Sequence, residues 1–204
     1  MELDRKLADG LAAMQLALPA GAQHKLLVYI DLLAKWNRTY NLTAVRDPGE
    51  MVSRHLLDSL AVLPYMHGKS LADLGSGAGL PGIPLAIARP DVAVTLVESN
   101  GKKARFLREA VRSLPLSNVT VDQARVQDAI GTFDTITARA FASLPNMLAW
   151  AGHLLAPNGR WLALKGRVDP AELGAVPRGF RVVVHELRVP GTDGGRCVVE
   201  LARA

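Results

Sequence analysis

The chain has 204 residues, 49% of them hydrophobic and 21% charged, with a formal net charge of +5 and a single cysteine. A chain of this length can hold one full α/β domain with a modest extension, and its hydrophobic fraction is that of a globular protein without low-complexity segments. No signal-peptide pattern, membrane-spanning apolar run or set of paired cysteines stands out, so we expect a cytoplasmic protein in a reducing compartment. A pI near 9.7 favours a polyanionic partner.

Residues 1–66 have helical spacing of apolar residues, in three stripes that begin at Leu3, Leu26 and Met51. These stripes predict a helical cap on the rest of the chain. Residues 36–43 combine aromatic and amide side chains with a positive charge, as a protein loop that stacks on and recognises an RNA base does. The same residues also suit a capped loop between two helices.

From residue 67 to residue 204 the pattern alternates between strands and helices, which predicts a Rossmann-like domain that forms one compact unit with the cap. The last two expected strands alternate as antiparallel or edge strands do. The predicted fold class is α/β, a seven-stranded doubly wound sheet with a late reversed strand and an N-terminal helical extension. The expected strands are Ser70–Leu74, Ala93–Glu98, Val119–Asp122, Phe133–Ala138, Trp161–Lys165, Arg181–Val189 and Cys197–Ala202.

A run of alternating glycines follows the first expected strand. That strand contains Asp73, and Gly75, Gly77 and Gly79 come before the next helix. Glycines let the backbone approach a nucleotide-like ligand closely, because side chains there would block it. An acid two residues before three alternating glycines is the pattern of S-adenosylmethionine sites. The carboxylate can accept a hydrogen bond from the ammonium group or, through water, help to fix the methionine end.

Other glycine-loop patterns fit less well. A Walker phosphate loop needs a glycine where Leu63 stands, five residues before Gly68, and a helix rather than the strand that follows. A dinucleotide fingerprint counted from Gly75 has Leu80 at its sixth position, and counted from Gly77 it starts two residues late. An ordinary glycine turn between a strand and a helix is the remaining alternative.

The second expected strand ends at Glu98. A carboxylate at that place can accept hydrogen bonds from both ribose hydroxyls of an adenosine. It can equally stabilise the N-terminus of the following helix through the helix dipole. Glu98 therefore supports an adenosine-containing cofactor without deciding which one.

The end of the fourth expected strand carries Arg139-Ala140-Phe141. Enzymes that methylate exocyclic amines usually have Asp/Asn-Pro-Pro-aromatic there, which this chain lacks. Cytosine-type carbon methylation needs a cysteine nucleophile, and Cys197 lies in the last strand, away from the expected ligand site, so we assign it to the core. The acceptor is then one that needs no activation, such as a ring nitrogen with a free lone pair. The five histidines show no metal-ligand spacing, and no metal is expected.

Basic residues gather near the same edge of the expected sheet. One helix places Arg105, Arg108 and Arg112 on one face, which is either a phosphate-binding stripe or a solvated surface. Three further cations follow or close expected strands. These three are the candidate catalytic residues, expected to hold phosphate or the acceptor edge of a base: Arg125, Arg139 and Lys165.

Four motifs between the second helix and Gly166 occur in a linked order. They are Trp36-Asn37 with Tyr40-Asn41-Leu42-Thr43, Arg54-His55 with Leu57-Asp58-Ser59, Gly79-Leu80-Pro81-Gly82-Ile83-Pro84, and Arg139-Ala140-Phe141-Ala142-Ser143-Leu144. Together they resemble the bacterial 16S rRNA guanine-7 methyltransferase family, called RsmG or GidB. The resemblance implies methyl transfer from S-adenosylmethionine to nitrogen 7 of guanosine 527 in the 530 loop of 16S rRNA.

The resemblance also implies which residues touch the cofactor. These are Gly75, Leu80, Val126, Gln127 and Arg139, with Glu98 on the ribose. Gln127 stands where an acid is common in the family, but its amide oxygen can still accept a hydrogen bond from the adenine amine. With the residues of the glycine pattern, the expected cofactor-binding set is Asp73, Gly75, Gly77, Gly79, Leu80, Glu98, Val126, Gln127 and Arg139.

Nitrogen 7 of guanine carries an unprotonated lone pair at neutral pH, so the predicted reaction needs no general base and depends mainly on alignment. The expected partner is 16S rRNA or the small ribosomal subunit, with no membrane, and the expected state is a monomer. Two other functions remain open. One is a methyltransferase for a small molecule or a protein, and the other is a non-catalytic rRNA- or ribosome-binding protein that keeps the fold.

Overall fold

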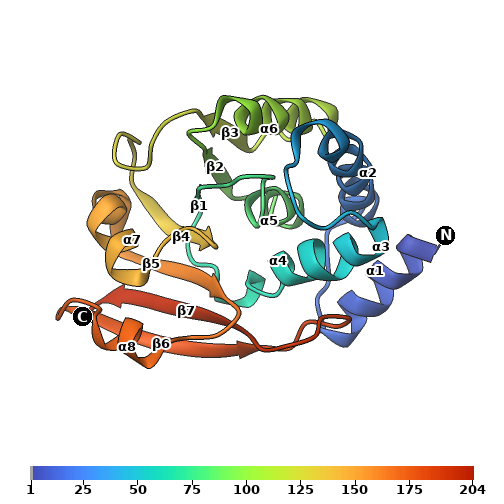
Figure 1. The fold of residues 1–204 in the computed structure, drawn as a ribbon. Helices are drawn as coiled ribbons and strands as arrows, with labels where there is room; N and C mark the ends of the chain where they lie inside the picture. Colours follow the sequence, from blue (N-terminus) through green and yellow to red (C-terminus); the bar gives the residue numbers. More distant parts are fainter. Residues whose placement is uncertain (1) are drawn as a thin grey trace.

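The computed structural model describes residues 2–204 and contains one seven-stranded sheet of order β3-β2-β1-β4-β5-β7-β6 (Figure 1). The first five strands are parallel, and β7 runs antiparallel to both β5 and β6. The predicted doubly wound sheet with a late reversed strand is therefore confirmed. The strands are β1 (Ser70–Leu74), β2 (Ala93–Val97), β3 (Val119–Asp122), β4 (Phe133–Arg139), β5 (Leu155–Lys165), β6 (Phe180–Leu187) and β7 (Arg196–Arg203).

Helices cover both faces of the sheet, as Figure 1 shows. One face carries α5 (Gly82–Ala88), α6 (Gly101–Ser113) and the N-terminal helices, and the other carries α7 (Leu144–Ala151) and α8 (Pro170–Gly174). No helix within residues 2–204 is long and apolar enough to cross a membrane. The N-terminal elements are α1 (Glu2–Ala13), α2 (Ala22–Tyr40), α3 (Pro48–Met51), a π-helix (Val52–Leu57), α4 (Asp58–Leu60) and a 3-10 turn (Leu63–Tyr65).

The N-terminal helices share a hydrophobic core with the sheet. Leu26 and Ile30 of α2, spaced by four residues and so on one helix face, belong to the same buried cluster as Leu71 of β1 and Leu96 of β2. The predicted cap of residues 1–66 is thus packed directly on the predicted Rossmann-like domain of residues 67–204. The boundary between the two stays a prediction, because one core spans it.

The predicted base-reading loop of residues 36–43 is wrong for its first half. Trp36 and Tyr40 lie inside α2, where their rings stack with centroids 5.2 Å apart. Trp36 also packs on Phe106 of α6, with centroids 5.7 Å apart. The helical spacing of apolar residues continues to Tyr40, so both rings stabilise the packing of α2 on α6.

Asn37 organises the second half of that segment. Its side chain is buried, accepts the Thr43 N–H at 2.9 Å and donates to the Val45 carbonyl at 3.1 Å. Asn41 ends α2 in the left-handed conformation, with φ of 50°. The capped interhelical loop is therefore the interpretation that the contacts support.

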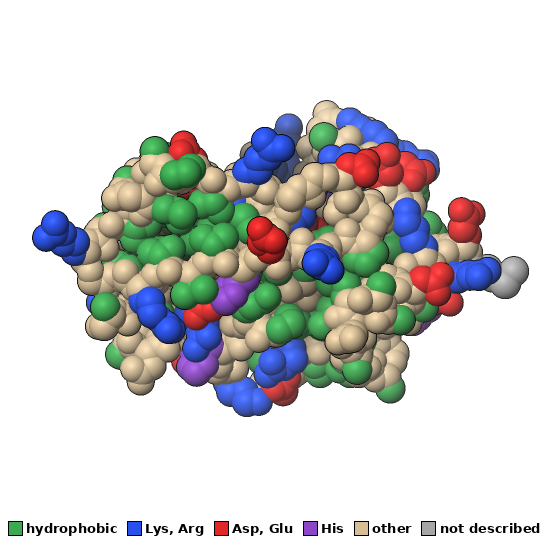
Figure 2. All heavy atoms as spheres, turned by 90° about the horizontal axis from the view of Figure 1, so that it is seen from below, with side chains coloured by type: hydrophobic (Ala, Val, Ile, Leu, Met, Phe, Trp, Pro, Cys, Tyr) green, Lys and Arg blue, Asp and Glu red, His purple; other side chains and the backbone are tan. Residues whose placement is uncertain are grey.

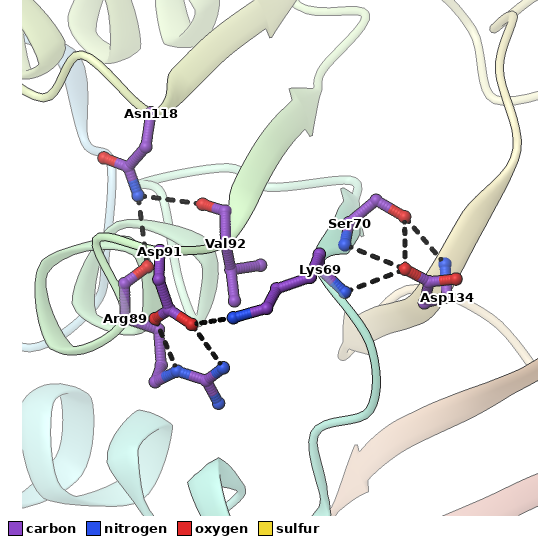
Figure 3. A network of polar contacts seen from close by, with 7 residues as sticks. All are labelled: Lys69, Ser70, Arg89, Asp91, Val92, Asn118 and Asp134. Atoms are coloured by element: carbon purple, nitrogen blue, oxygen red, sulfur yellow. Dashed lines mark hydrogen bonds and ion pairs between the residues drawn. The ribbon is translucent and has the colours of Figure 1, made fainter.

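Polar contacts tie together the amino ends of four strands (Figure 3). The Asp134 carboxylate of β4 accepts the N–H groups of Lys69 and Ser70, at 2.8 and 3.0 Å, and the Ser70 hydroxyl at 2.9 Å. The Lys69 ammonium pairs with Asp91, just before β2. Asn118, just before β3, donates to the Val92 carbonyl at 3.0 Å. This end of the sheet is fixed by polar contacts, and the carboxyl ends of the strands lie at the opposite edge.

Candidate functional site

A cleft of 410 Å³ lies at the carboxyl ends of β1, β2, β3 and β4. Its volume falls in the range of small-molecule sites, and its place is that of ligands in open α/β sheets. We call it the glycine-loop cleft. It is lined by Gly75, Val97, Glu98, Ser99, Lys103, Ala124, Arg125, Val126, Gln127, Ala140, Phe141 and Trp150.

Asp73 lies beneath the glycine loop and is fully buried. Its carboxylate accepts the Gly82 N–H at 3.1 Å and the Thr137 hydroxyl at 3.0 Å. Burial raises the pKa of this carboxyl to about 6, while the hydrogen bond from Thr137 acts in the opposite direction. In this structure Asp73 joins the start of α5 to β4 and does not line the cleft. Its contact with the cofactor remains a prediction.

The three alternating glycines adopt left-handed backbone conformations, with φ of 65° at Gly75, 57° at Gly77 and 86° at Gly79. A Cβ atom on Gly75 would lie 2.5 Å from the Phe141 ring, and one on Gly79 would lie 2.4 Å from the Ile83 side chain. Gly75 lines the cleft, whereas Gly79 and the neighbouring Leu80 are buried in the core behind the loop. The glycines therefore determine the path of the loop as well as the space in front of it.

Tyr29 of α2 holds this loop from behind, which the sequence did not indicate. Its hydroxyl is fully buried and donates to the Ala78 carbonyl at 2.6 Å. In the sequence Tyr29 is one apolar residue in a helical stripe, so nothing marks it as a loop contact. The N-terminal helices thus help to position the glycine loop.

Glu98 connects the glycine loop to the start of α6. Its carboxylate accepts the Gly77 N–H and the Asn100 N–H, each at 2.8 Å, and the residue is 6% exposed at the cleft. A carboxylate has about four lone-pair sites, so two acceptor positions remain for ligand hydroxyls. Val126 and Gln127 lie on the same cleft wall. This donor and acceptor set fits the adenosine part of S-adenosylmethionine.

A second pocket, of 590 Å³, adjoins the first at Ala140, which lines both. We call it the arginine pocket. Arg139 donates to Asp58 at 3.2 Å and to the Arg54 carbonyl at 3.3 Å, and Arg196 of β7 donates to the other Asp58 oxygen at 3.2 Å. The residues that line the arginine pocket include Thr43, Val45, Arg54, His55, Asp58, Arg139, Lys165, Arg167, Arg196 and Cys197.

His55 of the π-helix is neutral in this pocket. Burial, followed by the positive charge of Arg139, lowers its pKa to about 4. Its Nδ1 lies 2.9 Å from the Arg54 carbonyl and therefore donates, while Nε2 lies 2.9 Å from the Thr43 hydroxyl and accepts. Both ring nitrogens are engaged, so His55 acts as a structural bridge.

Cys197 lines the arginine pocket, and its predicted position away from the ligand site is wrong. Because β7 runs antiparallel to its neighbours, its first residues lie at the carboxyl ends of the parallel strands, and Cys197 pairs with Lys165 in the ladder. Burial raises the pKa of the thiol, and the thiol lies 3.5 Å from the Lys165 carbonyl. The group stays protonated at neutral pH, which does not suit a nucleophile.

The three candidate catalytic cations occupy two different places. Arg139 and Lys165 line the arginine pocket, and Arg125 is exposed at the glycine-loop cleft. The Lys165 ammonium lies 2.8 Å from the Glu172 carboxylate of α8 and 3.5 Å from the Ala142 carbonyl. Arg139 therefore lines a different pocket from the expected cofactor ligands that line the glycine-loop cleft, which are Gly75, Glu98, Val126 and Gln127.

The basic stripe on α6 is partly neutralised by its own neighbours. Arg112 pairs with Glu109 at 2.7 Å, and Arg108 donates to Gln123 at 3.1 Å. Arg105 is exposed. A solvated helix face describes at least Arg112 better than a phosphate-binding stripe does.

The family model described as rRNA small subunit methyltransferase G, called GidB, matches residues 22–196. The chain belongs to this family. It is 55% identical over 201 residues to the ribosomal RNA small subunit methyltransferase G of Xanthomonas campestris pv. campestris strain 8004, covering 97% of this chain and 94% of that one. The predicted family, methyltransferase activity and cofactor, S-adenosylmethionine, are thereby confirmed.

Solved structures confirm the fold. A methyltransferase from Geobacter sulfurreducens superimposes with a TM-score of 0.60 at 16% identity, covering 86% of this chain and 90% of that chain. The TYW2 protein of M. jannaschii in complex with AdoMet superimposes with a TM-score of 0.55 at 18% identity, covering 72% of this chain and 74% of that chain. The predicted fold class, a Rossmann-like methyltransferase sheet, agrees with these neighbours.

Proposed function

We propose that this family member transfers the methyl group of S-adenosylmethionine to nitrogen 7 of guanosine 527, in the 530 loop of 16S rRNA, and that it acts as a cytoplasmic monomer. The observation that supports this proposal most directly is that the glycine-loop cleft and the arginine pocket meet at Ala140. A methyl donor in one and an acceptor base in the other would face each other there. The Xanthomonas relative is named a ribosomal RNA small subunit methyltransferase, which supports rRNA as the acceptor.

The charge of the arginine pocket suits a polyanion. Asp58 is engaged by two guanidinium groups, Arg139 and Arg196, so the trio keeps a net charge of about +1. Arg167 adds an exposed cation to the same lining, and Arg54 adds another that lies 3.4 Å from the exposed Glu50 carboxylate. Figure 2 shows Lys and Arg side chains spread over one face with Asp and Glu side chains among them, and the whole chain has a formal net charge of +5. Such a surface favours the phosphates of an RNA acceptor.

The titratable groups in the arginine pocket favour an acceptor that needs no deprotonation. His55 has both ring nitrogens engaged, Asp58 is held by two arginines, and burial raises the pKa of the Cys197 thiol. None of these three residues is disposed to take a proton from an amine or to attack a ring carbon. Nitrogen 7 of guanine presents a lone pair that needs neither step.

When bound, S-adenosylmethionine supplies a methyl group on a positively charged sulfur. The residues of the chain then hold the two reactants in line, which can account for about 7–11 kcal/mol of the barrier. Arg139, aimed by Asp58 and the Arg54 carbonyl, would contact an RNA phosphate or a guanine carbonyl. A cation beside the ring itself would repel the charge that the purine gains, so the contact is expected at the oxygen atoms.

The other candidate residues keep assigned roles in this proposal. Arg125 would hold a phosphate at the edge of the glycine-loop cleft, where it is exposed. Lys165 would reach a phosphate only by exchanging its partner Glu172, so its present contacts favour a role in fixing the wall of the pocket. The proposed cofactor-binding residues are Asp73, Gly75, Gly77, Gly79, Leu80, Glu98, Val126 and Gln127, with Arg139 beside the reacting centre.

The test is transfer of labelled methyl groups to four acceptors: 30S subunits from cells that lack this modification, their deproteinised rRNA, their extracted proteins, and the small molecules of a cell extract. Label in 16S rRNA from the first or second acceptor supports the proposal. Label in protein, or only in small molecules of a cell extract, would assign the enzyme to the alternative methyltransferase class. Salt-dependent rRNA binding without any transfer would favour the non-catalytic alternative. Subunits that already carry the modification are the matched control and should accept no label.

A further inference from the structure

Trp150 of α7 is an aromatic residue whose exposure the packing of the fold does not explain. Its side chain is 39% exposed, whereas Trp161 is fully buried and Trp36 stacks on Tyr40. Trp150 lines the glycine-loop cleft. Covering an indole ring with an apolar or aromatic surface lowers the free energy, so an exposed Trp150 in a cleft indicates a contact with a ligand.

Contacts with Phe141 hold Trp150 at this position. The two rings meet edge to face, with centroids 6.0 Å apart and an interplanar angle of 86°. Phe141 in turn packs against Gly75, where an added Cβ would lie 2.5 Å from its ring. The pair therefore forms an aromatic wall that begins at the glycine loop and ends at the surface.

The packing of α7 places this wall beside the adenosine side of the cleft. Met147 and Leu148, one turn or less before Trp150, belong to the same buried cluster as Val126 and Ala129. Val126 and its neighbour Gln127 line the cleft together with Glu98. Trp150 thus borders the part of the cleft that carries the candidate adenine and ribose contacts.

We propose that Trp150 packs against the adenosine half of S-adenosylmethionine and closes the outer side of the glycine-loop cleft. The inference rests on the proposed assignment of this cleft to the cofactor. Loss of an aromatic platform under a base usually weakens binding about tenfold or more. Phenylalanine keeps an aromatic face, so Trp150→Phe should bind nearly as well as the wild type, whereas Trp150→Ala should not.

Tryptophan emission during titration with adenosine and with S-adenosylmethionine tests the contact. The wild-type protein and Trp36→Phe should show a saturable change with both ligands, and Trp150→Phe should show none although it binds them. Equilibrium dialysis of labelled S-adenosylmethionine gives the affinities independently. We expect Kd to rise about tenfold in Trp150→Ala and to change less than threefold in Trp150→Phe, with circular dichroism confirming that both variants are folded.

The outcomes separate this inference from the proposed function. Normal dialysis binding with no change in wild-type emission, or wild-type affinity in Trp150→Ala, overturns the inference and leaves the cofactor site intact. A change with S-adenosylmethionine but none with saturating adenosine also overturns it, because the ring would then border the methionine half. If Trp150→Ala is unfolded, the difference in ligand-induced emission change between the wild type and Trp150→Phe still tests whether Trp150 contacts the ligand. Failure of the wild type to bind the cofactor at all would overturn the proposed function as well.

Discussion

Replacing Tyr29 by phenylalanine removes one buried hydroxyl and leaves the ring in place. The hydroxyl donates to the Ala78 carbonyl at 2.6 Å, and both groups lie in the interior behind the glycine loop. Without this donor the Ala78 carbonyl becomes a buried acceptor without its present partner, which costs about 1–3 kcal/mol. For a chain of this size, a loss of about 2 kcal/mol lowers Tm by about 4–8 °C.

The same substitution should weaken cofactor binding, because Ala78 belongs to the loop that borders the glycine-loop cleft. If a loss of about 2 kcal/mol destabilised only the cofactor-bound conformation of the loop, Kd would rise about 30-fold, which is the largest effect that a loss of this size can have. Urea unfolding with and without S-adenosylmethionine measures both effects. Tyr40→Phe is the matched control, since the Tyr40 ring stacks on Trp36 and we expect a change within about 0.5 kcal/mol. Equal unfolding free energies and equal Kd values for Tyr29→Phe and the wild type would refute the role of Tyr29.

Two further predictions concern the arginine pocket. Arg139→Ala should lower kcat/KM for rRNA about 100-fold or more while the fold is retained, because a preorganised cation at the acceptor is lost; a variant that unfolds would instead make Arg139 a structural residue. The pKa of His55 is about 4 in the folded protein against 6.5 in the unfolded chain, so between these pH values the unfolded state binds one more proton. The contribution of His55 to stability is therefore complete above pH 6.5 and is lost as the pH falls toward 4. Asp73 has a raised pKa of about 6 and changes stability with pH in the opposite direction, so the wild type must be compared with His55→Gln. Between pH 7 and pH 4.5 the free energy of unfolding of the wild type should fall by about 2–3 kcal/mol more than that of this variant. A difference that does not depend on pH would contradict a neutral His55.

The sheet was predictable because its signals are local. Buried parallel strands read as short apolar runs, and the switch from helical to strand spacing near Ser70 is abrupt. The glycine pattern and Glu98 were also readable, because a loop that approaches a ligand restricts both backbone conformation and side-chain size. Both lie at the carboxyl ends of neighbouring strands, as their positions in the sequence predict.

The remaining features depend on tertiary contacts that a local pattern does not carry. Cys197 lies in the arginine pocket because β7 is reversed, which places the first residues of this strand at the carboxyl ends of the parallel strands. The local sequence around Cys197 does not indicate this placement. Tyr29 reads as an ordinary core residue until its hydroxyl meets Ala78. The π-helix that aims the Arg54 carbonyl toward Arg139 has no sequence signature either. Each of these depends on a partner more than 40 residues away, except Cys197, whose partner Lys165 is 32 residues away.

The most direct test of the account is to locate the transferred methyl group. After incubation of unmodified 30S subunits or rRNA with the protein and S-adenosylmethionine, nuclease fragments of 16S rRNA are analysed by mass spectrometry and their nucleosides identified. We expect one added methyl group in the fragment that contains the 530 loop, recovered as 7-methylguanosine at position 527. A methyl group on a different atom, on another nucleotide or on no part of 16S rRNA would contradict it.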